Sequence, residues 1–139
     1  MTAPASRPAA RPTLIHAILL VGSALLAAVL VGITAVRGPA AGSGWPVFFL
    51  YIPFFFAIPA VGVAFFLRQQ CAPLGTGVSF DQWWSTEGVK ALASWALLEG
   101  TAIVGAVFHM LTGSFLPLIV TGACLLLLAL FGPDRLAQP

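Results

Sequence analysis

Charged side chains are scarce in this sequence. Asp, Glu, Lys and Arg together make up 7% of the 139 residues, whereas they account for about a quarter of a typical soluble domain. Hydrophobic residues make up 60%, and the mean hydropathy is +1.03. A chain this small has too few polar side chains to cover its apolar residues in water. The composition therefore excludes an ordinary soluble domain and predicts that lipid surrounds most of the chain.

Metal-ligating and redox-active side chains are also few. The two cysteines, Cys71 and Cys124, do not have the spacing of a metal or redox motif, and we expect both to be free thiols. His16 and His109 are expected near opposite faces of the membrane, so they cannot bind one haem iron from its two sides. The sequence therefore predicts no metal and no cofactor.

Motifs of catalysis and of nucleic-acid binding are absent as well. The sequence has no phosphate-binding glycine loop and no spacing that pairs a nucleophile with a base. The formal net charge of +2 is spread over six Lys and Arg residues, which is too dilute for a nucleic-acid surface. We therefore expect a protein that is not an enzyme and binds no nucleic acid.

Four apolar runs are each close to the ~20 residues that a helix needs to cross a bilayer. We expect helices at 13–36, 46–68, 87–112 and 115–131, with a cytoplasmic loop at 69–86. The turn between the last two helices is so short that they must be antiparallel neighbours. The sequence thus predicts an all-α integral membrane four-helix bundle made of two antiparallel hairpins.

The basic residues predict the direction in which the helices cross the membrane. If the N-terminus is cytoplasmic, Arg37 alone of the six basic residues lies on the far side. This distribution follows the positive-inside rule. We therefore expect both termini in the cytoplasm, with 1–12 as a disordered tail rich in Pro and Ala and 133–139 as a second, short tail. The basic residues placed in the cytoplasm are Arg7, Arg11, Arg68, Lys90 and Arg135.

Glu99 is the most informative single residue. It lies near the middle of the third apolar run, where a carboxylate is costly and usually marks a functional site. The sequence places no basic residue at the same depth, so an ion pair is not expected. We expect Glu99 to be a neutral carboxyl group that is satisfied by hydrogen bonds.

The first two runs offer two alternative partners for Glu99, the Phe55 carbonyl or Ser23. Ser23 lies at the matching depth in the first run. Pro59 in the second run lacks an N–H group, which leaves the carbonyl of Phe55 without its helical donor. The predicted intramembrane polar site therefore consists of Glu99, Ser23, Pro59 and Phe55. Such a site could join helices, carry a proton or ion, or contact a lipid, quinone or pigment.

Tryptophans are expected at the membrane–water interface. Trp83 and Trp84 precede the third run, and Trp45 precedes the second. Indole rings are enriched at this level because they combine an apolar ring with one polar N–H group. We therefore predict that these three residues are interface anchors. Ser79 begins a capping-box pattern, which predicts a helical turn within the loop before the main helix starts at Glu87.

Small residues recur at four-residue spacing in two of the runs. The first run has Ala24, Ala28 and Gly32, and the third has Thr101 and Gly105. Small side chains let membrane helices approach closely. We therefore expect both stripes to contact protein rather than lipid.

The first and third runs also resemble each other. Residues 19–30 align without gaps on 97–108, with Gly22 opposite Gly100. This arrangement resembles the duplicated-hairpin proteolipids of rotary ATPases, and the resemblance implies that Glu99 carries an ion. The segment Leu98-Glu99-Gly100 is similar to one in small four-helix bacterial membrane proteins of unknown function. That second resemblance implies the fold but no activity.

These observations predict a structural or accessory subunit of a bacterial inner-membrane complex, or a homo-oligomer. The expected partners are the lipid bilayer and either other membrane subunits or further copies of the chain. The phenylalanine-rich second run and the Trp83–Trp84 segment are the expected contact surfaces. The alternatives are a protein that handles protons or ions through Glu99, and a protein that binds a lipid, quinone or pigment.

Overall fold

The computed structural model describes residues 10–40 and 46–137. Every regular element in these two ranges is helical, which confirms the all-α expectation. Residues 1–9 of the expected N-terminal tail, Trp45, and residues 138–139 lie outside the described ranges. The elements are α1 (Ala10–Arg37), the 3-10 helix η1 (Val47–Tyr51), α2 (Ile52–Gln69), α3 (Phe80–Thr112), α4 (Leu116–Leu130) and α5 (Pro133–Leu136).

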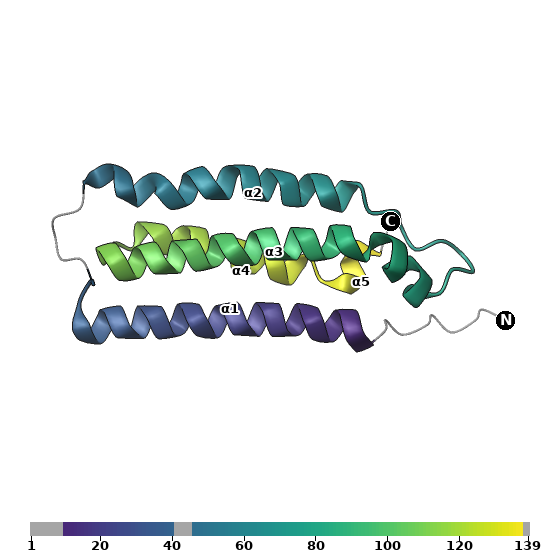
Figure 1. Cartoon of the computed structure of the whole chain (residues 1–139), viewed down its shortest axis with the longest axis horizontal. Helices are drawn as coiled ribbons and strands as arrows, with labels where there is room; N and C mark the ends of the chain where they lie inside the picture. Colours follow the sequence, from purple (N-terminus) through teal and green to yellow (C-terminus); the bar gives the residue numbers. More distant parts are fainter. Residues whose placement is uncertain (1–9, 41–45, 138–139) are drawn as a thin grey trace.

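The long helix α3 is the centre of the molecule. It packs against α1, α2 and α4, and its contact with α4 is the most extensive. Figure 1 shows α1 and α2 on opposite sides of α3, with α4 behind it. The antiparallel pairing of the last two helices is confirmed. The first hairpin is instead open: its two helices run antiparallel, but α3 lies between them.

Three of the helices are long and apolar enough to cross a membrane. They are α1, the segment Val47–Gln69 that joins η1 to α2, and α3. The fourth, α4, has 15 residues, which is about 22 Å at 1.5 Å per residue and shorter than the ~30 Å hydrocarbon layer. Because α4 runs from Leu116 to Leu130, the predicted range 115–131 is one residue too long at each end.

The third helix begins earlier than its apolar run. We expected a start at residue 87, but α3 starts at Phe80, and the loop is confined to residues 70–79. Ser79 is the N-cap, and its hydroxyl oxygen accepts from the backbone N–H of Gln82 at 3.2 Å. That cap fixes the first turn, and the polar residues that follow simply continue the same helix. The first helix likewise extends beyond the predicted 13–36, from Ala10 to Arg37.

The second helix begins later than predicted. Residues 47–51 form a 3-10 helix, and α2 proper starts at Ile52 rather than at residue 46. Pro53 lies in the first turn of α2, where a missing N–H group costs no helical hydrogen bond. Pro59 lies inside α2.

The C-terminal segment, expected as a short tail over 133–139, forms the short helix α5 in its described part and packs Pro133 and Leu136 into the core, while Asp134 and Arg135 are exposed. Leu136 is 4% exposed and belongs to the same apolar cluster as Phe80, Trp83 and Trp95. The backbone N–H of Leu74 donates to the carbonyl of Ala137 at 2.9 Å. The loop between α2 and α3 and the chain after α4 therefore cover one end of the molecule together.

Candidate functional site

Glu99 lies on the side of α3 that faces α1. Its carboxyl oxygen Oε1 is 3.1 Å from Oγ of Ser23, a residue of α1 that is only 2% exposed. Ser23 Oγ is also 2.5 Å from the carbonyl oxygen of Leu19, one turn earlier in α1. Glu99 itself is half-buried. The structure thus brings together two of the four residues that the sequence placed in one polar site.

The other two residues, Phe55 and Pro59, lie on α2, across α3 from Ser23. Within the described ranges, the Phe55 carbonyl makes no hydrogen bond to Glu99, and the Phe55 side chain is 73% exposed. The predicted contact between Glu99 and Phe55 is therefore wrong. The reason is geometric: one side chain on α3 cannot reach helices on both of its flanks. Pro59 instead lines an open groove of about 450 Å³ between α2 and α3, together with Gly100 and Thr101.

The two described tryptophans that we expected as interface anchors face inward. Trp83 is 3% exposed, and its Nε1–H donates to the carbonyl of Ala72 at 2.6 Å. Trp84 is half-buried and stacks on Trp95, with ring centroids 5.8 Å apart. Both residues belong to the first turns of α3 and not to a loop. The Trp83 N–H group and the rings of both residues therefore hold the first turns of α3 against the loop and the core, and Trp83 is too buried to form an exposed surface.

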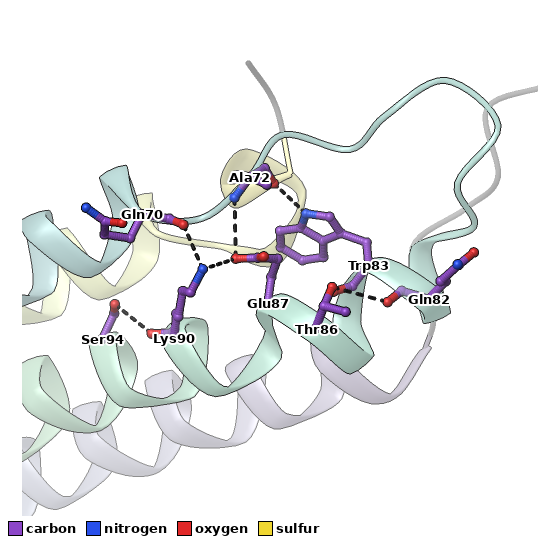
Figure 2. A network of polar contacts seen from close by, with 8 residues as sticks. All are labelled: Gln70, Ala72, Gln82, Trp83, Thr86, Glu87, Lys90 and Ser94. Carbon is purple, nitrogen blue, oxygen red and sulfur yellow. Dashed lines mark hydrogen bonds and ion pairs between the residues drawn. The ribbon is translucent and has the colours of Figure 1, made fainter.

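A polar network attaches the loop to the start of α3 (Figure 2). Lys90 and Glu87 form an ion pair at 2.7 Å, one turn apart on the same helix. Lys90 Nζ also donates to the carbonyl of Gln70 at 2.8 Å, and Glu87 Oε2 accepts from the backbone N–H of Ala72 at 3.3 Å. Lys90 thereby caps the C-terminal end of α2, where carbonyl groups have no helical donor.

Cys71 lies beside this network, in the loop that follows α2. Burial raises the pKa of its thiol, the Glu87 carboxylate raises that pKa further, and the Lys90 ammonium lowers it. The thiolate is therefore scarce at neutral pH, and Cys71 is a poor nucleophile there. The geometry gives no partner thiol for a disulfide, since both cysteines are free.

The end of α4 is held by side chains that the sequence did not point to. His16 of α1 lies with Nε2 2.8 Å from the carbonyl oxygen of Leu128, and Trp95 Nε1–H donates to the carbonyl of Phe131 at 2.7 Å. The His16 and Trp95 rings are 4.8 Å apart. The last carbonyls of a helix have no helical donor, and a short helix exposes them inside the apolar layer. One signal in the sequence pointed to these contacts. The fourth run is short, and the ring N–H groups of His16 and Trp95, which had no assigned partner, lie at the depth where it ends.

The two stripes of small residues have different surroundings. Gly105 of α3 lies directly against α4: a Cβ atom there would be 2.5 Å from Thr121 Oγ1 and 2.7 Å from the Pro117 carbonyl oxygen. In contrast, Ala24, Ala28 and Gly32 of α1 are all exposed. The expectation of protein contact is therefore confirmed for α3, whereas the α1 stripe is exposed in the described chain.

The described residues contain no group of three or more His, Cys, Asp or Glu side chains that could hold a metal ion. The candidate site is thus a single carboxyl–hydroxyl contact between two helices. No protein-family model, curated protein or solved structure matches this chain.

Proposed function

We propose that this chain is a non-enzymatic, multi-pass protein of a bacterial inner membrane, where it acts as a structural or accessory subunit. In this proposal all four main helices lie across the bilayer, with α4 reaching only part of the way, and α1 contacts another subunit or a second copy of the chain. Lipid covers the remaining apolar surface. The exposed stripe of small residues on α1 is the observation that carries the proposal.

The distribution of basic residues supports a cytoplasmic location for both termini. Figure 1 shows that the start of α1, the end of α2, the start of α3 and the described C-terminus all lie towards one end of the molecule. Arg11 and Arg68 belong to helix termini at that end, and Arg135 belongs to α5. Arg37 ends α1 at the opposite end. This asymmetry fits the positive-inside rule if the first end is cytoplasmic.

Thiol labelling tests this orientation, because the chain contains only two cysteines. We expect a membrane-impermeant maleimide to label Cys71 in inside-out vesicles and not in right-side-out vesicles. The rate should increase as pH rises, since the raised pKa of this thiol keeps thiolate scarce at neutral pH. Cys124 is 1% exposed and should stay unlabelled, and Cys71→Ser should abolish the signal. Preferential labelling from the other side would contradict a cytoplasmic loop.

The α1 stripe supports association because small residues elsewhere in the same chain already serve a close helix contact within the molecule. On α3, Gly105 allows α4 to approach so closely that no side chain fits between the helices. On α1, no heavy atom lies within 4 Å of a Cβ atom built at Gly32. Membrane helices gain little by turning small residues to lipid, whereas small residues favour close helix contacts.

Gly32→Leu tests the proposed contact through α1. We expect the substitution to leave the fold of the single chain intact, because the site is open, but to weaken association by about 1–2 kcal/mol, a factor of roughly 5–30 in the association constant. The measurement is the fraction of the chain that is associated, as a function of the detergent-to-protein ratio. Energy transfer between labelled copies detects self-association, and native mass spectrometry detects association with co-purified subunits.

Gly62→Leu on α2 is the matched control, because Gly62 is also an exposed helical glycine, and a Cβ atom added there would have no heavy atom within 4 Å. It should leave association unchanged. Equal association for the parent and for Gly32→Leu would refute the proposed role of α1. The native mass spectra also report any lipid, quinone or pigment that remains bound to the chain.

A further inference from the structure

The contact between α1 and α3 contains one hydroxyl group and two acceptor oxygens. Ser23 Oγ lies 2.5 Å from the carbonyl oxygen of Leu19 and 3.1 Å from Glu99 Oε1. A serine hydroxyl has a single proton to donate but can accept through its lone pairs. The shorter distance assigns that proton to the Leu19 carbonyl, as is common for serine within a helix. The contact with Glu99 therefore needs a proton from the carboxyl group.

We propose that Glu99 is a neutral carboxylic acid that donates to Ser23 Oγ, so that one bound proton joins α1 to α3. In this arrangement the Glu99 carboxyl group donates to Ser23 Oγ, and the Ser23 hydroxyl group donates to the Leu19 carbonyl. An ionised Glu99 would place a carboxylate oxygen against a hydroxyl oxygen whose proton is already engaged. The assignment goes beyond the proposed association through α1 and does not depend on it.

The helices that flank α3 bring no charge to the pair that would favour the ionised form. On α1, the nearest titratable group is His16, which contacts the Leu128 carbonyl instead. On α2, Arg68 lies in the last turn, with its guanidinium 4.9 Å from the centre of the Phe131 ring. On α4, the titratable side chain is Cys124, which packs in an apolar cluster.

The charged and titratable groups of α3 itself are also distant. Lys90 and His109 are each more than two turns from Glu99 along the helix. Lys90 is paired with Glu87, and His109 Nδ1 lies 2.8 Å from the carbonyl oxygen of Ser114. Neither group therefore compensates a negative charge on Glu99.

This pair is also the only side-chain hydrogen bond between α1 and α3 in the described ranges; the other interhelical hydrogen bond from an α1 side chain runs from His16 to α4. Loss of the proton should therefore weaken the attachment of α1 specifically. The contact is present while the carboxyl group holds its proton.

Infrared spectroscopy of the full chain in lipid tests the protonation state directly. The sequence has only four Asp and Glu side chains. Asp81 and Asp134 are exposed, and Glu87 is ion-paired, so we expect these three to contribute carboxylate bands to the spectrum. We expect the parent to show one carbonyl band of a neutral carboxylic acid. Glu99→Gln should abolish that band completely.

Two further variants make the result specific. Glu87→Gln changes the other glutamate of α3 and should leave the band unchanged. Ser23→Ala removes the acceptor and should move the band without abolishing it. A parent spectrum without the band would overturn the proposal regardless of how any variant folds. Persistence of the band in Glu99→Gln, or an unmoved band in Ser23→Ala, would overturn it as well.

Discussion

Trp95→Ala is expected to destabilise the protein by about 3 kcal/mol, the lower end of the range for a fully buried tryptophan. Trp95 is 0% exposed and lies between Trp84 and His16, with its N–H group bonded to the Phe131 carbonyl. The substitution leaves a cavity and removes the donor at the end of α4. The lower end applies because lipid is as apolar as the core, so that the loss is one of close contacts rather than of burial from water.

Trp95→Phe separates the two contributions. It keeps an aromatic ring in place but leaves the Phe131 carbonyl without its donor, which costs about 1–3 kcal/mol. The measurement is the midpoint of unfolding by sodium dodecyl sulfate in mixed bicelles, followed by circular dichroism. Val89→Ala is the control, since Val89 is on the same helix and 76% exposed. If Trp95→Ala and Val89→Ala unfold at the same midpoint, Trp95 does not support the end of α4.

The helices themselves could be predicted because hydrophobic length is a strong signal. The apolar runs located the main body of each long helix, and the short Gly113 turn correctly implied that α3 and α4 pair. The boundaries were less accurate wherever a polar cap and not apolar content decides where a helix starts. Ser79 shows this: its hydroxyl starts α3 seven residues before the apolar run that we took as the helix.

The candidate site was predictable in depth but not in direction. Counting residues along two helices placed Ser23 opposite Glu99, and the structure has them 3.1 Å apart. The same counting placed Phe55 nearby, yet α2 lies on the other flank of α3. In a soluble protein, an apolar stripe would have shown which face of each helix is inside. Helices in lipid are apolar on all faces, so the sequence contains little information about their rotation.

The inward position of Trp83 has a related cause. An indole ring near a helix end fits the interface pattern equally well whether it faces lipid or protein. Its direction depends on the loop carbonyl of Ala72 and on Leu136, which reach it only through the tertiary fold. Polar groups with specific partners therefore determine how the helices of this chain are rotated and capped, whereas apolar length determines where the long helices lie in the sequence.

Gly105→Ala provides the sharpest test of the close approach between α3 and α4. The added Cβ would meet Thr121 Oγ1 at 2.5 Å and the Pro117 carbonyl oxygen at 2.7 Å. Neither atom can move freely, because the first donates to the Ala102 carbonyl at 3.0 Å and the second belongs to the backbone of α4. The helices must separate, and we expect a loss of about 1–3 kcal/mol in the free energy of unfolding.

Gly100→Ala is the matched comparison, because it adds the same methyl group to the same helix where no heavy atom lies within 4 Å. Alanine favours a helix over glycine by about 0.5–1 kcal/mol, so this variant should be as stable as the parent or slightly more so. Gly105→Ala should therefore lower the unfolding midpoint, whereas Gly100→Ala should leave it unchanged or raise it slightly, although both variants gain the same intrinsic helix propensity. Equal shifts would mean that α4 does not lie against Gly105, and the central contact of the fold would have to be reassigned.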